Sequence, residues 1–423
     1  MKNIYSNNAT LESNSRVKKG KLHTVSEFRR EAGIPLVIAK KMIVWGEVEA
    51  VKLVDGTLRI TEADVVKVKN LVRNPRKKFA LYVKALGPGL ITGASDDDPS
   101  GIGTYSAVGA MFGFSILWMA VWLLPVMLAV QEVCARIGIV TNKGLTKVLG
   151  GRFNKKTMGA IVLLLIVANV VNIGADLGAM AASLNLVTGA NISAASLFFA
   201  LLIVFLEIFF RYRTYVKFLK WLTIAVFAYI VTGFLIHPDW REVFENAFIP
   251  NIRFSENYIF AMIAVFGTTV TPYLFFWQTS EEVEENKLLS EQERRSSMHC
   301  RISHMRTDVG TGMILANVVF FFIVLTTAQV LFKNGITTID SADQAALALR
   351  PLAGEASYLL FAIGIIGTGL LAIPILAGSG AYALSEVMKW HEGLELKFSR
   401  AKGFLYGYRS FDFGGVGTQF PPY

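Results

Sequence analysis

The chain has 423 residues, of which 53% are hydrophobic and 30 are phenylalanine, and its mean hydropathy is +0.46. These values exclude an ordinary soluble domain and are typical of an integral membrane protein. In such a protein the net charge of +10 indicates cytoplasmic loops rich in lysine and arginine rather than a surface for nucleic acid. The two cysteines, Cys134 and Cys300, lie in an apolar segment and a polar loop, so neither a disulfide framework nor a cysteine–histidine metal site is predicted.

A small polar module precedes the first apolar segment. Residues 1–21 are rich in Asn, Ser and Lys; they are expected to be disordered and lack the apolar core of a signal peptide. A capping signature at Thr24 is followed by a helix expected over 36–45, a hairpin around Asp55-Gly56 and a last helix capped by Thr61. These elements predict a separately folded module over residues 22–72.

The order of these elements resembles the winged helix-turn-helix of excisionase and MerR-type proteins. In that fold the second helix enters the major groove of DNA, so the resemblance implies DNA as a partner of the module. It implies phosphate or groove contacts from four basic residues: Lys40, Lys41, Lys52 and Arg59. A cytoplasmic module that binds another protein is the alternative, because charged faces are usually just solvated.

Apolar runs long enough to cross a bilayer alternate with loops along the rest of the chain. Roughly eight membrane spans are predicted, at about 79–110, 111–140, 157–187, 192–210, 215–236, 261–280, 306–332 and 356–388. The loops near 188–192, 237–257 and 333–355 carry few basic residues. The loops on the other side are rich in them: 136–156, 211–220, 287–306 and 389–402. Basic residues also crowd positions 73–84. The positive-inside rule therefore predicts a multi-pass protein of a bacterial-type plasma membrane with its N-terminus in the cytoplasm.

The first span contains three consecutive aspartates and a proline, in the sequence GASDDDPSG over Gly93–Gly101. Pro99 removes a helical hydrogen bond and frees the carbonyl four residues back, and charge at bilayer depth tends to mark an ion pathway. Adjacent helical residues point about 100° apart, so the three aspartates cannot all face one ion. Asp98 is the first candidate ligand, Asp97 is expected to hold a bound water or line the path, and Asp96 to line the path or pair with a neighbouring helix.

A second interrupted span, AMIAVFGTTVTPYLFFWQTS over residues 261–280, matches the first. Pro272 frees the carbonyl of Thr268, beside the hydroxyls of Thr269 and Thr271. Paired interrupted helices in corresponding halves of a chain indicate the substrate site of a transporter. Two ordinary proline kinks are the alternative, because such kinks are common in membrane helices.

Several motifs in these spans resemble the NRAMP family of divalent-metal transporters. The similar motifs occur in order over about 79–408: Gly87-Pro88-Gly89, Asp98-Pro99-Ser100-Gly101, QEVCARIG over 131–138, ADLG over 175–178 and Thr271-Pro272-Tyr273. The resemblance implies an all-α integral membrane protein with a LeuT-type fold of two inverted five-helix repeats. It also implies metal ligands at Asp98, Gly101, the carbonyl of Thr268 and Thr271, with Asp97 and Tyr273 beside them.

The departures from the family pattern change the expected substrate. Gly101 stands where the family has Asn, and Thr271 where it has Met. Carboxylate, carbonyl, hydroxyl and water suit Mg²⁺, Ca²⁺ and Mn²⁺, whereas a thioether favours softer metals, and small residues leave room for the waters that Mg²⁺ retains. The sequence TPYLFFWQ is similar to the sixth helix of the NRAMP-related magnesium transporter subgroup. We therefore expect Mg²⁺ or Mn²⁺, or both, as transported substrates, with no bound cofactor.

The chain lacks several of the side chains that the resemblance would assign to proton coupling. Tyr273 and Gln278 stand where the family has two histidines, and Ala179 where it has an acid, although Asp176 remains. Because histidine is the side chain that titrates near neutral pH, uncoupled transport driven by the membrane potential is predicted. Proton-coupled symport of Mn²⁺ or a transition metal is the alternative. We expect three residues to line the ion pathway: Asp96, Asp176 and Gln278.

Two further predictions concern the glutamates after the second interrupted span and the C-terminal residues. The four glutamates within Glu281–Glu285 are expected to form a solvated helix end, with an acidic vestibule as the alternative. Residues 391–423 lack a spanning segment and are expected to form an aberrant tail, which leaves the second repeat incomplete. An inactive remnant and a membrane-tethered DNA-binding regulator are therefore the competing functions. An enzyme is not expected, because no phosphate-binding glycine motif occurs.

Overall fold

The computed structural model describes most of the chain, in two compact units. It describes residues 22–34, 38–39, 42–43, 48, 50–52, 58–75, 77, 88–209, 227–287, 298–339, 341–393, 403, 407–408 and 410–411. Unit 1 comprises residues 1–87 and 290–306, and unit 2 comprises residues 88–289 and 307–423. Most of the predicted tail over 391–423 lies outside the described residues.

Unit 1 contains a small antiparallel sheet and two helices. The strands β1 (Leu22–Thr24), β2 (Ala50–Lys52) and β3 (Leu58–Thr61) lie in the order β1-β3-β2. Helices α1 (Val25–Ala32) and α3 (Glu62–Arg73) contribute to a core that includes Phe28, Ile60 and Val65. The predicted helix start at Thr24 is confirmed: its hydroxyl accepts the Glu27 N–H at 3.1 Å, and the Glu27 carboxylate accepts the Thr24 N–H at 2.8 Å.

The helix-turn-helix itself stays a prediction. Lys40, Lys41, the Asp55-Gly56 turn and most of the helix expected over 36–45 lie outside the described residues, as does the side chain of Lys52. Arg59 lies half-buried on β3.

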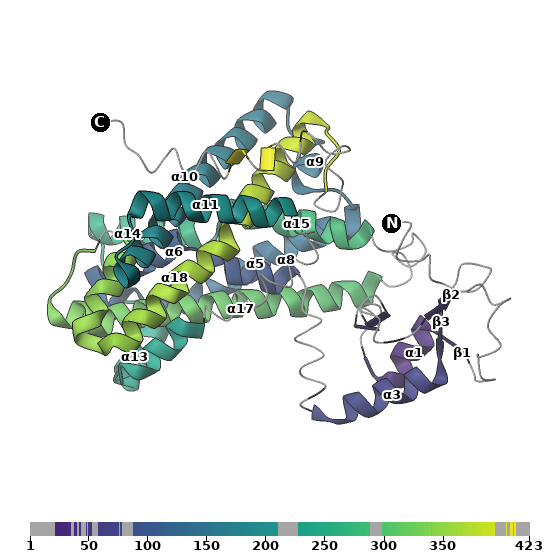
Figure 1. Cartoon of the computed structure of the whole chain (residues 1–423), viewed down its shortest axis with the longest axis horizontal. Coiled ribbons are helices and arrows are strands. Elements are labelled where there is room, and N and C mark those ends of the chain that lie inside the picture. Colours follow the sequence, from purple (N-terminus) through teal and green to yellow (C-terminus); the bar gives the residue numbers. More distant parts are fainter. Residues whose placement is uncertain are drawn as a thin grey trace. The chain divides into compact units, whose positions relative to one another are not determined.

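Every element described in unit 2 is helical (Figure 1). The helices are α5 (Pro88–Asp96), α6 (Pro99–Phe112), η1 (Gly113–Ile116), α7 (Trp118–Trp122), α8 (Leu124–Thr141), α9 (Leu145–Leu149), α10 (Lys155–Thr188), α11 (Ile192–Phe209), α13 (Trp240–Phe248), α14 (Glu256–Thr269), α15 (Pro272–Lys287), α17 (Met298–Val330, of which residues 307–330 belong to unit 2), η2 (Phe332–Asn334) and α18 (Ala342–Met388). Residues 227–235 are helical as well.

Five segments among the described residues are long and apolar enough to cross a membrane: Trp118–Thr141, Lys155–Thr188, Glu256–Lys287, Arg301–Asn334 and Leu359–Met388. Each coincides with a predicted span, so the prediction of a multi-pass helical membrane protein is confirmed. The first predicted span is divided between α5 and α6, the fourth corresponds to the shorter α11, and most of the span expected over 215–236 lies outside the described residues.

Two of the predicted connections between spans contain helical residues. The loop expected over 237–257 contains α13, whose first turn is capped by Asp239, the carboxylate of which accepts the Arg241 N–H at 3.0 Å. The connection expected over 333–355 includes the first part of α18, which begins at Ala342, and the membrane segment itself begins at Leu359. Charge and hydropathy identify where a chain leaves the membrane, but they do not exclude helices outside it.

Close backbone packing fixes α5 against α17, and Figure 1 shows the two helices side by side. A Cβ atom added at Gly93 would overlap the carbonyl of Gly312, and one added at Gly312 would overlap the carbonyl of Gly89. Asp308 on α17 accepts the N–H groups of Gly89 at 2.9 Å and Leu90 at 3.3 Å. The first turn of α5 is therefore held by a buried carboxylate from the second half of the chain.

Candidate metal site

The first membrane segment breaks at its acidic centre. Helix α5 ends at Asp96 and α6 begins at Pro99, with Asp98 between them in an extended conformation (φ −68°, ψ 164°). The Asp98 carboxylate accepts the Gly101 N–H at 2.6 Å and the Ser100 hydroxyl at 2.8 Å. Aspartate is a preferred N-cap and proline a preferred first helical residue. The sequence thus stops one helix and starts the next, as predicted.

A second carboxylate reaches the start of α6 from α10. Asp176 is fully buried, and one of its oxygens accepts the Ser100 N–H at 2.9 Å. The N-terminus of a helix carries partial positive charge, which stabilises nearby anions. Asp98 and Asp176 therefore both lie at the positive end of α6.

The second membrane segment breaks beside the first. Helix α14 ends at Thr269 and α15 begins at Pro272, and Val270 has left the helical region (φ −108°, ψ 67°). A Cβ atom added at Gly101 would lie 3.0 Å from Asp98 Oδ1, 3.1 Å from Thr268 Oγ1 and 3.5 Å from the Asp96 carbonyl oxygen. A carboxylate, a hydroxyl and a peptide oxygen from the two breaks thus surround the small space that the missing side chain of Gly101 leaves.

Two tyrosines join the breaks to each other. The Tyr273 hydroxyl donates to the carbonyl of Ser95 at 2.8 Å, the carbonyl that Pro99 was predicted to free. Tyr105 Oη and Thr269 Oγ1 lie 3.0 Å apart in a hydrogen bond. These contacts hold the end of α5 against α15 and the end of α14 against α6.

Several oxygens near the breaks are buried without a hydrogen-bond partner in the described part of the chain. They are both carboxylate oxygens of Asp97, one oxygen each of Asp96 and Asp176, and the Thr271 hydroxyl. Isolated buried charge is very costly unless it is paired or coordinates a metal. No three His, Cys, Asp or Glu side chains among the described residues are grouped to hold a metal. The available donors are one or two carboxylates with hydroxyls, carbonyls and water, a hard-oxygen set.

A buried polar chain extends from α5 along α15. The Thr92 hydroxyl donates to Gln278 Oε1 at 2.7 Å, and Gln278 Nε2 donates to Glu282 Oε1 at 3.0 Å. Glu281 and Glu282 are 3% and 5% exposed. The expectation that these two glutamates form a solvated helix end is therefore wrong.

Packing of α8 along α15 explains this burial. The Thr279 hydroxyl donates to the carbonyl of Cys134 at 3.0 Å, and Asn286 Nδ2 donates to the carbonyl of Gly138 at 3.2 Å. A Cβ atom at Gly138 would overlap the carbonyl of Thr279. Asp308 and Thr92 were not predicted to take part in the site; the only signals in the sequence were a single acid and a single hydroxyl inside apolar segments.

Known proteins of similar sequence are metal transporters. The profile of the family described as natural resistance-associated macrophage protein-like matches residues 89–408. A divalent metal cation transporter, MntH, from Erwinia tasmaniensis is 25% identical over 340 residues, which are 78% of each chain. MntH from Yersinia pestis (strain Pestoides F) is 26% identical over 304 residues, 70% of this chain and 71% of the relative.

Among solved structures, a manganese transporter from Eremococcus coleocola, crystallised with an aromatic bis-isothiourea compound, has a similar fold. The TM-score is 0.65 at 18% sequence identity, and the match covers 81% of this chain and 76% of that one. A variant of the same transporter, in which one histidine is replaced by alanine, matches with a TM-score of 0.63 over the same shares of the two chains. The described helices therefore form a transporter fold of the LeuT type.

Proposed function

The chain belongs to the natural resistance-associated macrophage protein (NRAMP) family of transporters, and we propose that it carries divalent metal cations, Mg²⁺ and Mn²⁺, across the membrane. Its curated relatives are transporters of divalent metal cations rather than enzymes. The observation that carries the proposal is the convergence of oxygens from both breaks on the space at Gly101.

The chemistry of the donors supports a hard cation. Asp98 supplies charge, Thr268 and Thr271 supply neutral oxygens, and no thioether or amide side chain stands at positions 101 and 271. Oxygen ligands suit Mg²⁺ and Mn²⁺, and Mg²⁺ usually keeps several waters because it dehydrates reluctantly. Both oxygens of Asp97 and one of Asp176 have no hydrogen-bond partner among the described residues; they are suited to hold such waters and to line the path with Asp96 and Gln278.

The drive for transport is proposed to be the membrane potential alone. Helices α5, α6, α10, α14 and α15 contain no histidine, and histidine is the side chain that titrates near neutral pH. A divalent ion that crosses 100 mV gains about 4.6 kcal/mol, from about 2.3 kcal/mol per charge. Such a gradient supports accumulation without a proton.

The experiment that tests the function is metal flux into proteoliposomes for the wild type and for Asp98→Asn. Asparagine is as good an N-cap as aspartate, so α6 still begins at Pro99 while the charge is lost. We expect Mg²⁺ and Mn²⁺ influx to fall at least about tenfold, since an isolated ion loses a charged ligand. Unchanged influx in a correctly folded Asp98→Asn protein would contradict the proposal.

For unit 1 we propose a cytoplasmic location and a DNA or protein partner. The basic residues at 73–84 precede the first span, which favours the cytoplasmic side. Retention of the full chain on DNA that falls steeply with salt would identify DNA as the partner.

A further inference from the structure

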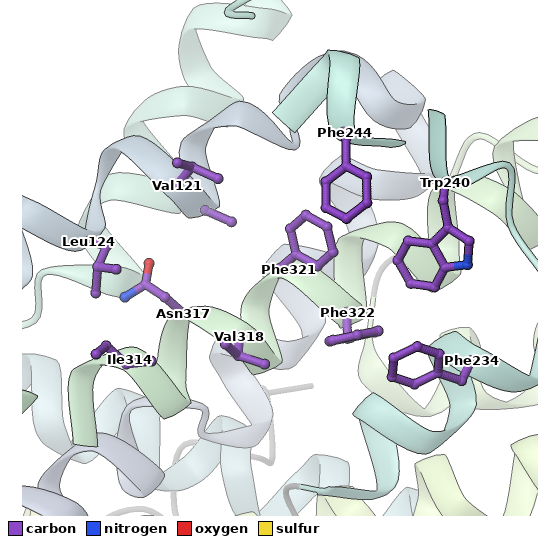
Figure 2. Close-up of a pocket in the computed structure, with 11 residues that line it drawn as sticks. Val121, Leu124, Phe234, Trp240, Phe244, Ile314, Asn317, Val318, Phe321 and Phe322 are labelled. Carbon is purple, nitrogen blue, oxygen red and sulfur yellow. The ribbon is translucent and has the colours of Figure 1, made fainter. Parts of the chain in front are cut away.

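A cavity of about 490 Å³ lies between α7, α8, α13, α17 and the helix over residues 227–235. Its volume is in the range of small-molecule sites, about 300–1,000 Å³. Its lining includes no residue of either break. Figure 2 shows Asn317 near Leu124 and Val121 at one side of the cavity, with Phe234, Trp240 and Phe244 at the other.

The cavity is continuous with the surface that faces the bilayer. Helix α8 lies in the membrane segment Trp118–Thr141, and the lining part of α17 lies in the segment Arg301–Asn334. Four lining side chains are also exposed at the surface of unit 2: Phe234 (56%), Phe244 (52%), Ile314 (49%) and Val318 (36%). Ile314 and Val318 lie within the membrane segment Arg301–Asn334, so apolar molecules of the bilayer reach the cavity from this side.

One polar group stands in this apolar lining. Asn317 is 4% exposed, and its Nδ2 donates to the carbonyl of Met313 at 3.0 Å and contacts Met127 Sδ at 2.7 Å. These contacts fix the amide so that Oδ1 is the free end, and Oδ1 is buried without a hydrogen-bond partner among the described residues. In Figure 2 this oxygen points toward Val121. A buried acceptor of this kind favours a ligand that brings a donor.

We propose that the cavity binds an apolar molecule from the bilayer that carries a single hydroxyl, such as a long-chain alcohol. The hydroxyl donates to Asn317 Oδ1, and the hydrocarbon body packs against Phe321, Phe322 and Trp240. A plain hydrocarbon or the acyl tail of a phospholipid fills the same space but leaves the Asn317 oxygen unpaired. The site does not depend on which ion the protein transports.

The position of this ligand connects it to the metal site. α17 holds the start of α5 through Asp308, and α8 packs along α15 through Cys134 and Gly138. A molecule between α8 and α17 therefore contacts the helices that support α5 and α15. Its binding can change the distance between these two half-helices.

The test is photolabelling of the purified full chain in nanodiscs with a diazirine-bearing hexadecanol and, as a matched probe, the same compound without the hydroxyl. Labelled residues are mapped by peptide mass spectrometry. We expect the alcohol to label Phe321 or Trp240 about five- to tenfold more than the hydrocarbon does, as one hydrogen bond to a buried acceptor predicts. Leu164, which is 70% exposed on α10, reports ordinary contact with lipid and should be labelled equally by both probes.

Two variants separate the hydroxyl contact from the cavity itself. Asn317→Leu should lower labelling by the alcohol to the level of the hydrocarbon, and Val121→Phe should fill the space and abolish cavity labelling by both probes. Excess unlabelled hexadecanol should compete at Phe321 in the wild type but not at Leu164, a readout that needs no variant. Equal labelling by the two probes in the wild type, undiminished labelling in either variant, or failure of this competition would overturn the proposal.

Discussion

At the scale of single residues, Gly101 leaves space at the site because it has no side chain. Any side chain at this position would come within 3.0–3.1 Å of Asp98 Oδ1 and Thr268 Oγ1, so glycine keeps open the space that their oxygens face. Thr271 adds a buried hydroxyl without a partner in the described structure. Small residues at both positions leave a site with hard donors and room for water, which suits Mg²⁺.

Thr271→Met tests the chemical basis of this selectivity. The substitution replaces a hydroxyl with a thioether, which favours softer metals, and takes up space that water would occupy. We expect the ratio of Mn²⁺ to Mg²⁺ influx to rise about tenfold, equivalent to about 1.4 kcal/mol. Competition of the two ions in proteoliposomes measures the ratio. Thr271→Ser keeps the hydroxyl and should leave the ratio near that of the wild type; a ratio that Thr271→Met does not change would exclude position 271 from the site.

At the scale of elements, the two broken helices depend on unbroken ones. Helix α5 is fixed by α17 through Asp308 and through backbone contact at Gly93 and Gly312, while α6 receives Asp176 from α10. The first turns of α5 and α6 are therefore each held by a carboxylate from a long neighbouring helix, in keeping with the need for irregular backbone at membrane depth to be buried within protein.

Gly312→Ala should destabilise this packing. The added methyl group would overlap the carbonyl of Gly89, and overpacking of a tight contact costs about 1–3 kcal/mol. Gly310→Ala is the matched control on the same helix, because its Cβ meets nothing within 4 Å; better helix propensity should make it neutral or stabilising by up to about 1 kcal/mol. Thermal unfolding in detergent measures both. Equal melting temperatures for the two variants would show that α5 and α17 do not pack as described.

At the scale of the whole molecule, the arrangement is that of a transporter whose substrate site lies between two interrupted helices. Helices α5, α6, α10, α14 and α15 contain no histidine. We therefore expect the metal to cross without the accompanying proton that a symporter carries. A cation that moves alone carries net charge, so its influx should follow the membrane potential.

Uncoupled transport predicts the behaviour of two signals in vesicles. With a potassium–valinomycin potential negative inside, Mg²⁺ influx should rise while a pH dye in the lumen records no acidification beyond that of protein-free vesicles. Reversing the sign of the potential is the control and should suppress influx. Acidification in proportion to the metal taken up would instead support proton coupling through Asp96, Asp97 or Asp176.

The breaks and most spans were predictable because their causes are local. Pro99 and Pro272 disrupt their own helices, and Asp98 caps the helix it precedes. The burial of Glu281 and Glu282 was not predictable, because four nearby acids indicate solvent unless the packing of α8 along α15 is known. Nor could local sequence pair Asp308 with Gly89, which lies 219 positions away. Local rules identify where a helix stops, whereas long-range packing decides what surrounds its end.

The most direct measurement of the central claim is Mg²⁺ and Mn²⁺ binding by calorimetry to Gly101→Ala and Gly267→Ala. Both add one methyl group near Thr268, but only the first places it 3.0–3.1 Å from Asp98 Oδ1 and Thr268 Oγ1; the second meets nothing within 4 Å. We expect Gly101→Ala to weaken binding at least about tenfold, or about 1.4 kcal/mol, and Gly267→Ala to bind like the wild type. Equal affinities of the two variants and the wild type would contradict a metal site between the broken helices.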